Sequence, residues 1–275
     1  MSFRNAPKLR NQGFGLIELI VVIAIIAFLI AMLVPAIQKV REAATRSQSM
    51  NNLKQIALAF HSFHDGNKQF PFNGTNAAVA NDSTTGSWAF QILPYLDQQP
   101  LFQNIDRKAA IVTYLCPGRM RPGVETSNGG GAWTDYFLNN YLNDAKNASK
   151  PNNPNQKRTF VGITDGTSNT VLVGHGNINT TQYQSDANVT LSTNIFMGGT
   201  TGTMRSGDNG EANPTGVTLQ QDSDKAPKIG SWGGPFSQGA LMALCDGSVR
   251  MVSYSFNDLN ALLTPAGGEA VNLPD

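Results

Sequence analysis

The sequence predicts an α+β protein in which one long N-terminal helix packs on an antiparallel sheet. An apolar run over residues 14–37 continues into an amphipathic helical pattern over residues 38–65. Further along the chain, short β-rich runs flank two Asp-Gly dipeptides, and Asp-Gly between two apolar runs is a strong hairpin signal. The helical and strand patterns therefore occupy separate parts of the chain, as in the α+β class.

The composition of the 275-residue chain limits the classes of function that the protein can have. Its net charge of +1, with 14% charged residues, excludes a protein held on nucleic acid by phosphate neutralisation, which needs a basic excess. The 40% hydrophobic residues supply a core, whereas 27 Gly and 14 Pro predict many turns and long loops. We expect a folded protein with no nucleic-acid partner.

The apolar run is long enough to cross a membrane. At about 1.5 Å per residue, its roughly 24 residues span about 36 Å, more than the roughly 30 Å of a hydrocarbon core. Arg4, Lys8 and Arg10 precede it, and basic residues favour the cytoplasmic side. A cleaved secretory signal has a shorter apolar part. The sequence thus predicts a single pass through the cytoplasmic (inner) membrane, with the N-terminus in the cytoplasm and the remaining chain exported.

Glu18 is the single charge in the apolar run. A carboxylate inside a bilayer is costly and needs a partner, which the neighbouring residues cannot supply. If the chain is cut between Gly13 and Phe14, the new amino group of Phe14 is a suitable cation, on the same helix or on a copy shifted along the axis. Such a pair would set the register between subunits. Later in the run Pro35 lacks an N–H, so the helix is expected to bend or melt there.

The helical pattern over residues 38–65 is amphipathic, and Gly66 follows it as a stop signal. One stripe suited to packing on a globular domain contains Val40, Ala43, Ala44, Ser47, Met50, Leu53, Ala57, Phe60 and His64.

The N-terminal residues resemble a type IV pilin or a type II secretion pseudopilin: a basic leader, Gly13, Phe14, Glu18 and a long apolar helix. The resemblance implies that a prepilin peptidase cuts between Gly13 and Phe14 and methylates the Phe14 amine. It also makes Glu18 the assembly-register residue and Pro35 the helix-kinking proline. The implied parts are a leader over residues 1–13, a transmembrane or filament-core helix over 14–37, an amphipathic extension over 38–65 and an exported α+β head over 66–275.

The sequence of the head predicts short helices in its first part and strands in its later part. Ser87 is expected to cap a helix in WAFQILPYL, and QQPLFQNI follows as another helix. Two hairpins are expected around Asp-Gly turns, one from residues 159–163 and 170–173 and the other from residues 241–245 and 248–252.

The head resembles a large family of prepilin-like proteins of unknown function with a C-terminal His-x9-Asp-Gly motif. Asp246 and Gly247 match this motif, but Phe236 stands where the His is expected, and His175 stands where an acidic residue is usual. Any chemistry that the family His performs is therefore doubtful in this chain. The matching stretches are NNLKQIALAFHSFHD, SWAFQILPYLDQQPLF, VTYLCPGR, ITDGTSNTVLVG and LCDGSVRMV.

No catalytic motif is present: the sequence has no Gly-x-Ser-x-Gly elbow, no His-Glu-x-x-His and no Walker loop. His61 and His64 could share a helix face as metal ligands, but no third ligand is identifiable. They lie amid phenylalanines, so packing is the favoured interpretation. We expect no enzyme.

The oxygens of Asp208, Asn209 and Glu211 lie in a Gly-rich stretch of the kind that calcium prefers, and some pseudopilins bind calcium in C-terminal loops. The full calcium-loop pattern is absent, so a solvated loop is favoured and no cofactor is expected. Cys116 and Cys245 are both expected to be exported, where a disulfide is stable. A bridge between them and two buried free thiols are the alternatives.

Two functions compete. The first is a structural subunit that prepilin peptidase processes and that joins other subunits, through its N-terminal helix, in a type IV pilus-like or type II secretion-like filament at the cell surface. The alternative is a membrane-tethered module that binds an envelope or polysaccharide ligand, with Trp88, Trp133 and Trp232 as sugar platforms if they are exposed. Membrane lipid is a partner in both.

Overall fold

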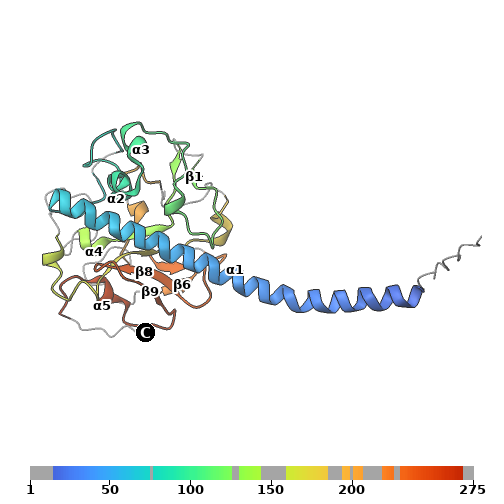
Figure 1. The fold of residues 1–275 in the computed structure, drawn as a ribbon. Helices are drawn as coiled ribbons and strands as arrows, with labels where there is room; N and C mark the ends of the chain where they lie inside the picture. Colours follow the sequence, from blue (N-terminus) through green and yellow to red (C-terminus); the bar gives the residue numbers. More distant parts are fainter. Residues whose placement is uncertain are drawn as a thin grey trace, which may run out of the picture. The chain divides into compact units, whose positions relative to one another are not determined.

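The protein divides into two compact units, unit 1 with residues 1–44 and unit 2 with residues 45–275 (Figure 1). The leader, helix and head boundaries predicted after residues 13, 37 and 65 stay predictions. The computed structural model describes residues 15–74, 77–125, 130–143, 159–184, 194–198, 201–206, 219–225 and 230–268.

One helix, α1, runs over Leu16–Asn67. It continues through Pro35 without interruption, so the local melting expected there does not occur, because losing one backbone donor leaves the other hydrogen bonds of the helix in place. A bend at Pro35 stays a prediction. The helix ends just beyond the predicted stop: Lys68 has a φ of 55°, and its N–H donates to the His64 carbonyl at 2.7 Å, which closes the last turn.

The part of α1 that belongs to unit 2 packs one face into the core. The prediction is right for Leu53, Ala57 and Phe60. It is wrong for members of the stripe that are exposed, which are Val40, Ala43, Ala44, Ser47 and Met50. The buried face is rotated from the predicted stripe because polar side chains also pack inward. Its residues are Ser49, Asn52, Leu53, Ile56, Ala57, Ala59, Phe60 and Phe63.

Short helices follow α1, as predicted: α2 over Trp88–Gln91, the 3₁₀ helix η1 over Leu93–Leu96 and α3 over Gln99–Gln103. Ser87 precedes α2 but does not cap it with its side chain. Its hydroxyl donates instead to the Ile195 carbonyl at 2.8 Å, so a contact distant in sequence replaces the expected cap.

The central sheet has five strands in the order β5-β3-β4-β8-β9. The pairs β3–β4, β4–β8 and β8–β9 are antiparallel, whereas β3–β5 is parallel. The sheet is therefore mixed, and the prediction of a purely antiparallel sheet is wrong at this edge. The strands are β3 (Tyr136–Asn139), β4 (Val171–His175), β5 (Met204–Arg205), β8 (Ala240–Leu244) and β9 (Val249–Val252).

The two Asp-Gly sites behave differently. Asp246 and Gly247 form the tight turn between β8 and β9, as predicted, and Gly247 has a φ of 83° that suits glycine. Before the other Asp-Gly, Phe160–Gly162 forms the 3₁₀ helix η3 rather than a strand. The prediction of the first hairpin is therefore wrong, because β4 pairs with β3 and β8 instead.

Smaller elements complete the described chain. They are β1 (Val124–Glu125) paired with β2 (Gly131–Ala132), β6 (Leu219–Gln221) paired with β7 (Trp232–Gly234), α4 (Asn140–Asn143), α5 (Leu259–Leu263), and the 3₁₀ helices η2 (Val112–Tyr114), η4 (Thr180–Gln182) and η5 (Thr201–Thr203).

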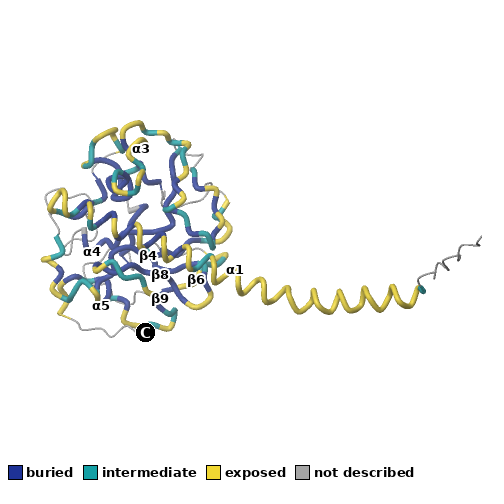
Figure 2. The backbone as a smooth tube through the Cα atoms, in the orientation of Figure 1, coloured by how far each residue is buried: buried dark blue, intermediate teal, exposed yellow. Residues whose placement is uncertain are grey.

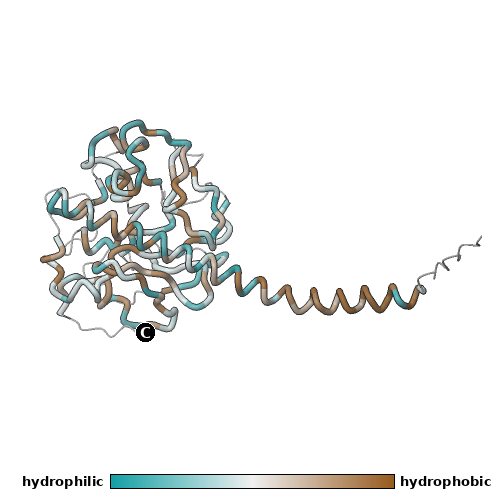
Figure 3. The backbone as a smooth tube through the Cα atoms, viewed as in Figure 1, coloured by the Kyte–Doolittle hydropathy of each residue, from teal (hydrophilic) through white to brown (hydrophobic). Residues whose placement is uncertain are grey.

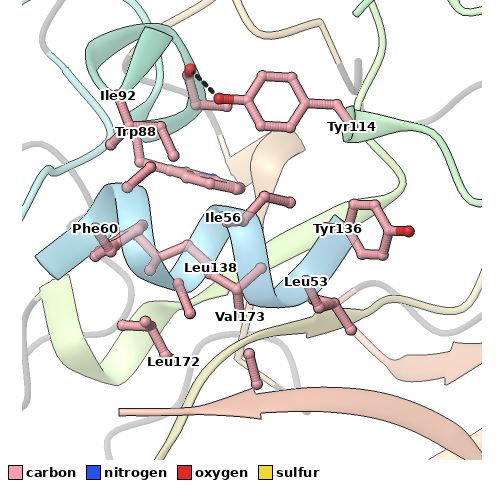
Figure 4. Close-up of a cluster of buried hydrophobic side chains, with 14 of the residues drawn as sticks. Leu53, Ile56, Phe60, Trp88, Ile92, Tyr114, Tyr136, Leu138, Leu172 and Val173 are labelled. Atoms are coloured by element: carbon pink, nitrogen blue, oxygen red, sulfur yellow. Dashed lines mark hydrogen bonds between the residues drawn. The ribbon is translucent and has the colours of Figure 1, made fainter. Parts of the chain in front are cut away.

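The sheet separates two hydrophobic clusters. Alternate side chains of β8 enter different clusters: Leu241 and Ala243 join the one that contains the α1 face, and Met242 and Leu244 join the one that contains α5. This is the two-residue alternation of a strand that is buried on both faces. Figure 4 shows side chains of the α1 cluster, including Trp88, which lies against Phe60 with ring centroids 5.7 Å apart.

Candidate functional site

The predicted assembly residues lie at the start of α1. The Glu18 side chain folds back, and its Oε2 accepts a hydrogen bond from the Gly15 N–H at 3.0 Å. This satisfies a backbone donor that the first turn of a helix leaves unpaired. Gly13 and Phe14 lie outside the described residues, so the structure describes the predicted cleavage site only from Gly15 onward.

Among the described residues, nothing covers the apolar part of α1. The large apolar side chains from Leu16 to Ile37 are between 46% and 76% exposed, and Figures 2 and 3 show this segment as exposed and hydrophobic. Among the described residues, α1 is the one helix long and apolar enough to cross a membrane, with a mean hydropathy of 3.2 in its most apolar 18-residue window. The segment needs an apolar environment from outside the chain.

The motif residues Asp246 and Gly247 connect two stretches that are far apart in sequence. The Asp246 N–H donates to the Thr167 carbonyl at 3.0 Å, and the Asp246 Oδ1 accepts from the Ser248 N–H at 2.8 Å. The turn also lies close to α1, because a Cβ placed on Gly247 would be 3.8 Å from His61 Nε2. The Asp-Gly motif therefore has a structural task, which is to hold the β8–β9 turn against its surroundings.

Four charged side chains in unit 2 form a buried chain of charges, which no sequence motif predicts. Its members are Arg119, Arg121, Asp135 and Asp222. Arg119 Nε donates to Asp222 Oδ2 at 2.8 Å, and its Nη1 lies 3.4 Å from Asp135 Oδ1. Asp135 also accepts from Arg121 Nη1 at 2.7 Å. Burial lowers the pKa of Arg119, but Asp222 and Asp135 outweigh it and hold that pKa well above its usual value. These ion pairs join segments that lie up to 103 residues apart.

Asp222 has two further hydrogen-bond partners outside the chain of charges. It also accepts from the Ile178 N–H at 3.0 Å and from the Tyr183 hydroxyl at 2.6 Å. Burial raises the pKa of Tyr183. Arg119 offsets part of this rise, and the pKa remains above its usual value. Tyr183 is thus a neutral donor to the Asp222 carboxylate.

A second polar group lies where α1 meets β4. Ser49 Oγ is 2.9 Å from His175 Nε2 and 2.8 Å from the Tyr136 hydroxyl. Burial, and then Arg119, hold the pKa of His175 well below its usual value, so the ring is neutral. The His175 ring also lies 5.7 Å from that of Phe236, the residue that replaces the motif His.

The Ser49–His175 pair has the separation of a nucleophile and a base, but its surroundings do not suit catalysis. Both residues are 0% exposed, so neither reaches a substrate from solvent. Within the described part of the chain, His175 Nδ1 also has no hydrogen-bond partner, and a catalytic triad needs an orienting group there. The pair is a polar contact between α1 and the sheet.

The other candidates have structural surroundings. His61 stacks on Phe160 with ring centroids 4.3 Å apart, and within the described ranges no group of three or more His, Cys, Asp or Glu could hold a metal. The calcium candidates Asp208, Asn209 and Glu211 lie outside those ranges. Trp88, Trp133 and Trp232 are at most 2% exposed, so the condition for sugar platforms, which is exposure of the rings, is not met. The rings supply core area instead.

Cys116 and Cys245 are both buried free thiols, which is the second of the two alternatives. Burial raises the pKa of Cys116 to about 11 and that of Cys245 well above its usual value. Because the thiolate is the reactive form, both cysteines are inert in the folded protein.

Comparison with known families gives two matches, which follow one another along the chain. The prokaryotic N-terminal methylation motif matches residues 8–34, which identifies a pilin-like, membrane-anchored and exported protein. The family described as "Protein of unknown function (DUF1559)" matches residues 38–259. No curated protein and no solved structure matches the chain. Because the second match covers most of the sequence, the chain belongs to the DUF1559 family and carries a prepilin-type N-terminal methylation motif.

Proposed function

We propose that the mature chain is a structural subunit of a type IV pilus-like or type II secretion-like filament, assembled through the N-terminal part of α1. The observation that carries the proposal is the methylation motif over residues 8–34, which coincides with the exposed apolar helix. Lipid covers this helix before assembly, and the same helix of neighbouring subunits covers it afterwards.

Processing prepares the helix for assembly. Prepilin peptidase cuts between Gly13 and Phe14 at the cytoplasmic face and methylates the Phe14 amine. Glu18 is the counter-charge for that amine on a neighbouring subunit, and the pair sets the axial step of a non-closing, helical contact. The contact between Glu18 and the Gly15 N–H supports this role, because it holds the carboxylate at the first turn, next in sequence to the new chain end.

The tethered binding module is the weaker proposal, because its tryptophans are buried. The orientation proposed for both functions is the same: the N-terminus begins in the cytoplasm, α1 crosses the inner membrane and unit 2 is exported. The two functions differ in whether the chain leaves the membrane for a filament.

The test compares Glu18→Gln with Glu42→Gln in the native cells. Both substitutions neutralise a carboxylate on α1, but Glu42 lies beyond the apolar run. Peptide mass spectrometry of membranes and of sheared surface material is expected to find a chain that starts at methylated Phe14, and to find wild type and E42Q in the sheared fibres. E18Q is expected to be processed but lost from the fibres. An uncut chain that retains residues 1–13 and stays in the membrane would refute the proposal.

A further inference from the structure

Arg205 is a buried cation whose hydrogen bonds go to carbonyl groups alone. It ends the edge strand β5 and is 6% exposed. Its Nη1 donates to the Met204 carbonyl at 2.8 Å and to the Gly202 carbonyl at 3.3 Å. In the part of the chain that the structure describes, no carboxylate forms an ion pair with Arg205. The N–H groups of Nε and Nη2 have no acceptor there either.

The guanidinium group is held in place by its packing. Its Cζ atom lies 3.6 Å from the centroid of the Phe137 ring. Gly176 approaches closely, since a Cβ on this residue would come within 2.7 Å of Arg205 Nε and 2.6 Å of the Phe137 ring. A glycine is therefore required beside the stack. The group keeps one orientation, with the edge formed by Nε and Nη2 unused; this is the edge that binds a carboxylate with two parallel hydrogen bonds.

Among the described residues, the arginines of this region outnumber the carboxylates by one. Arg119 and Arg121 form ion pairs with Asp135 and Asp222, whereas Arg205 is acted on by Asp222 only from beyond ion-pair distance. Burial, and then repulsion by Arg119 and Arg121, lower the pKa of Arg205 to about 9, although Asp222 acts in the opposite direction, so the guanidinium group is still protonated at neutral pH. A buried charge without a counter-charge destabilises a fold, and a bound anion would remove that cost.

We propose that Arg205 anchors a binding site for a monoanionic carboxylate, held by the Nε and Nη2 edge of its guanidinium group. One carboxylate neutralises the excess charge, whereas a phosphate dianion would reverse it. Because Arg205 is only 6% exposed, a single carboxylate group fits this edge better than a flat charged surface does. The group belongs either to a free small acid or to a uronic-acid sugar within a polysaccharide.

The test uses the full chain in an uncharged detergent at constant ionic strength. The thermal midpoint of unfolding, followed by tryptophan fluorescence, is measured with sodium glucuronate, glucose, sodium phosphate or polygalacturonate. We expect glucuronate to raise the midpoint by about 2 to 4 °C at concentrations well above its Kd, and glucose and phosphate to have no such effect. A response to polygalacturonate at a much lower carboxylate concentration identifies the polymer as the source.

Three variants decide whether Arg205 is responsible. Arg205→Met keeps the contact with Phe137 and removes the charge, so without carboxylate its midpoint is expected to equal or exceed that of the wild type, and the glucuronate response is lost. Arg205→Lys keeps the charge without the two-pronged edge and should weaken glucuronate binding at least about tenfold. Arg250→Met, at an exposed arginine of β9, should respond like the wild type. An equal response to glucose, or a full glucuronate response in R205M or R205K, would overturn the proposal.

Discussion

Residues 16–37 and 45–67 belong to the same helix but meet opposite conditions. In the first segment the large apolar side chains are at least 46% exposed, whereas in the second Leu53, Ile56 and Phe60 are fully buried. The second segment packs against other parts of unit 2, whereas the first packs against none of the residues that the structure describes. Hydrophobicity alone therefore does not indicate a core: the apolar surface that a chain leaves open must be covered by lipid or by other subunits.

The contrast extends to charge. Glu18 is the lone carboxylate of an apolar segment, and it accepts a hydrogen bond from the backbone N–H of Gly15, just before its own helix. In unit 2 the carboxylates of Asp135 and Asp222 are buried, and arginines pair with them. Substitutions in unit 2 should therefore change folding, and those at the start of α1 should change assembly.

The largest effect is expected from Arg119→Ala. It leaves Asp222 and Asp135 buried with too little positive charge, and breaking a buried ion pair on one side costs about 3 to 5 kcal/mol. The free energy of unfolding, from urea denaturation of the full chain in detergent followed by tryptophan fluorescence, measures the loss. Arg250→Ala, at an exposed arginine, is the control and should change stability by less than about 0.5 kcal/mol. A loss below 1 kcal/mol for R119A would show that the chain of charges does not stabilise unit 2.

The second-largest effect is expected when a leucine is replaced by alanine in one of the two segments of α1 but not in the other. Leu53→Ala removes a fully buried side chain and should lower the free energy of unfolding of unit 2 by about 3 kcal/mol. Leu29→Ala, at a side chain that is 55% exposed, should leave it unchanged. The same urea denaturation measures both variants. Similar losses for L53A and L29A would break the comparison, because they would make residues 16–37 part of the folding unit.

The sequence was sufficient for features that depend on local patterns. The length of α1 follows from one continuous apolar and amphipathic pattern, and the turn at Asp246-Gly247 follows from a dipeptide that suits a tight hairpin. The methylation motif is likewise a short, ordered set of residues, and the family match over residues 8–34 agrees with it.

Features that depend on distant contacts could not be predicted. Asp165-Gly166 has the same local signal as Asp246-Gly247, yet η3 precedes it because the partners of β4 come from β3 and β8. The parallel strand β5 is equally non-local. Arg119 and Asp222 are ordinary polar residues in sequence, and only the fold brings them to 2.8 Å.

The smallest effect concerns pH and His175, whose neutral ring accepts or donates at Ser49 and faces the charge of Arg119. Because its pKa in the folded state lies well below 6.5, the unfolded chain takes up the proton first as the pH falls. The contribution of His175 to stability should therefore be constant above about pH 7 and should fall by about 1 kcal/mol between pH 7.5 and pH 5.5. Urea denaturation at pH 7.5, 6.5 and 5.5 measures it. His175→Gln retains a polar contact for Ser49 but cannot titrate, so it should remove most of this dependence, whereas His61→Gln, at a half-buried ring whose pKa is also lowered by burial, should remove a smaller part. An H175Q variant as acid-sensitive as the wild type would mean that the pH dependence comes from elsewhere in unit 2.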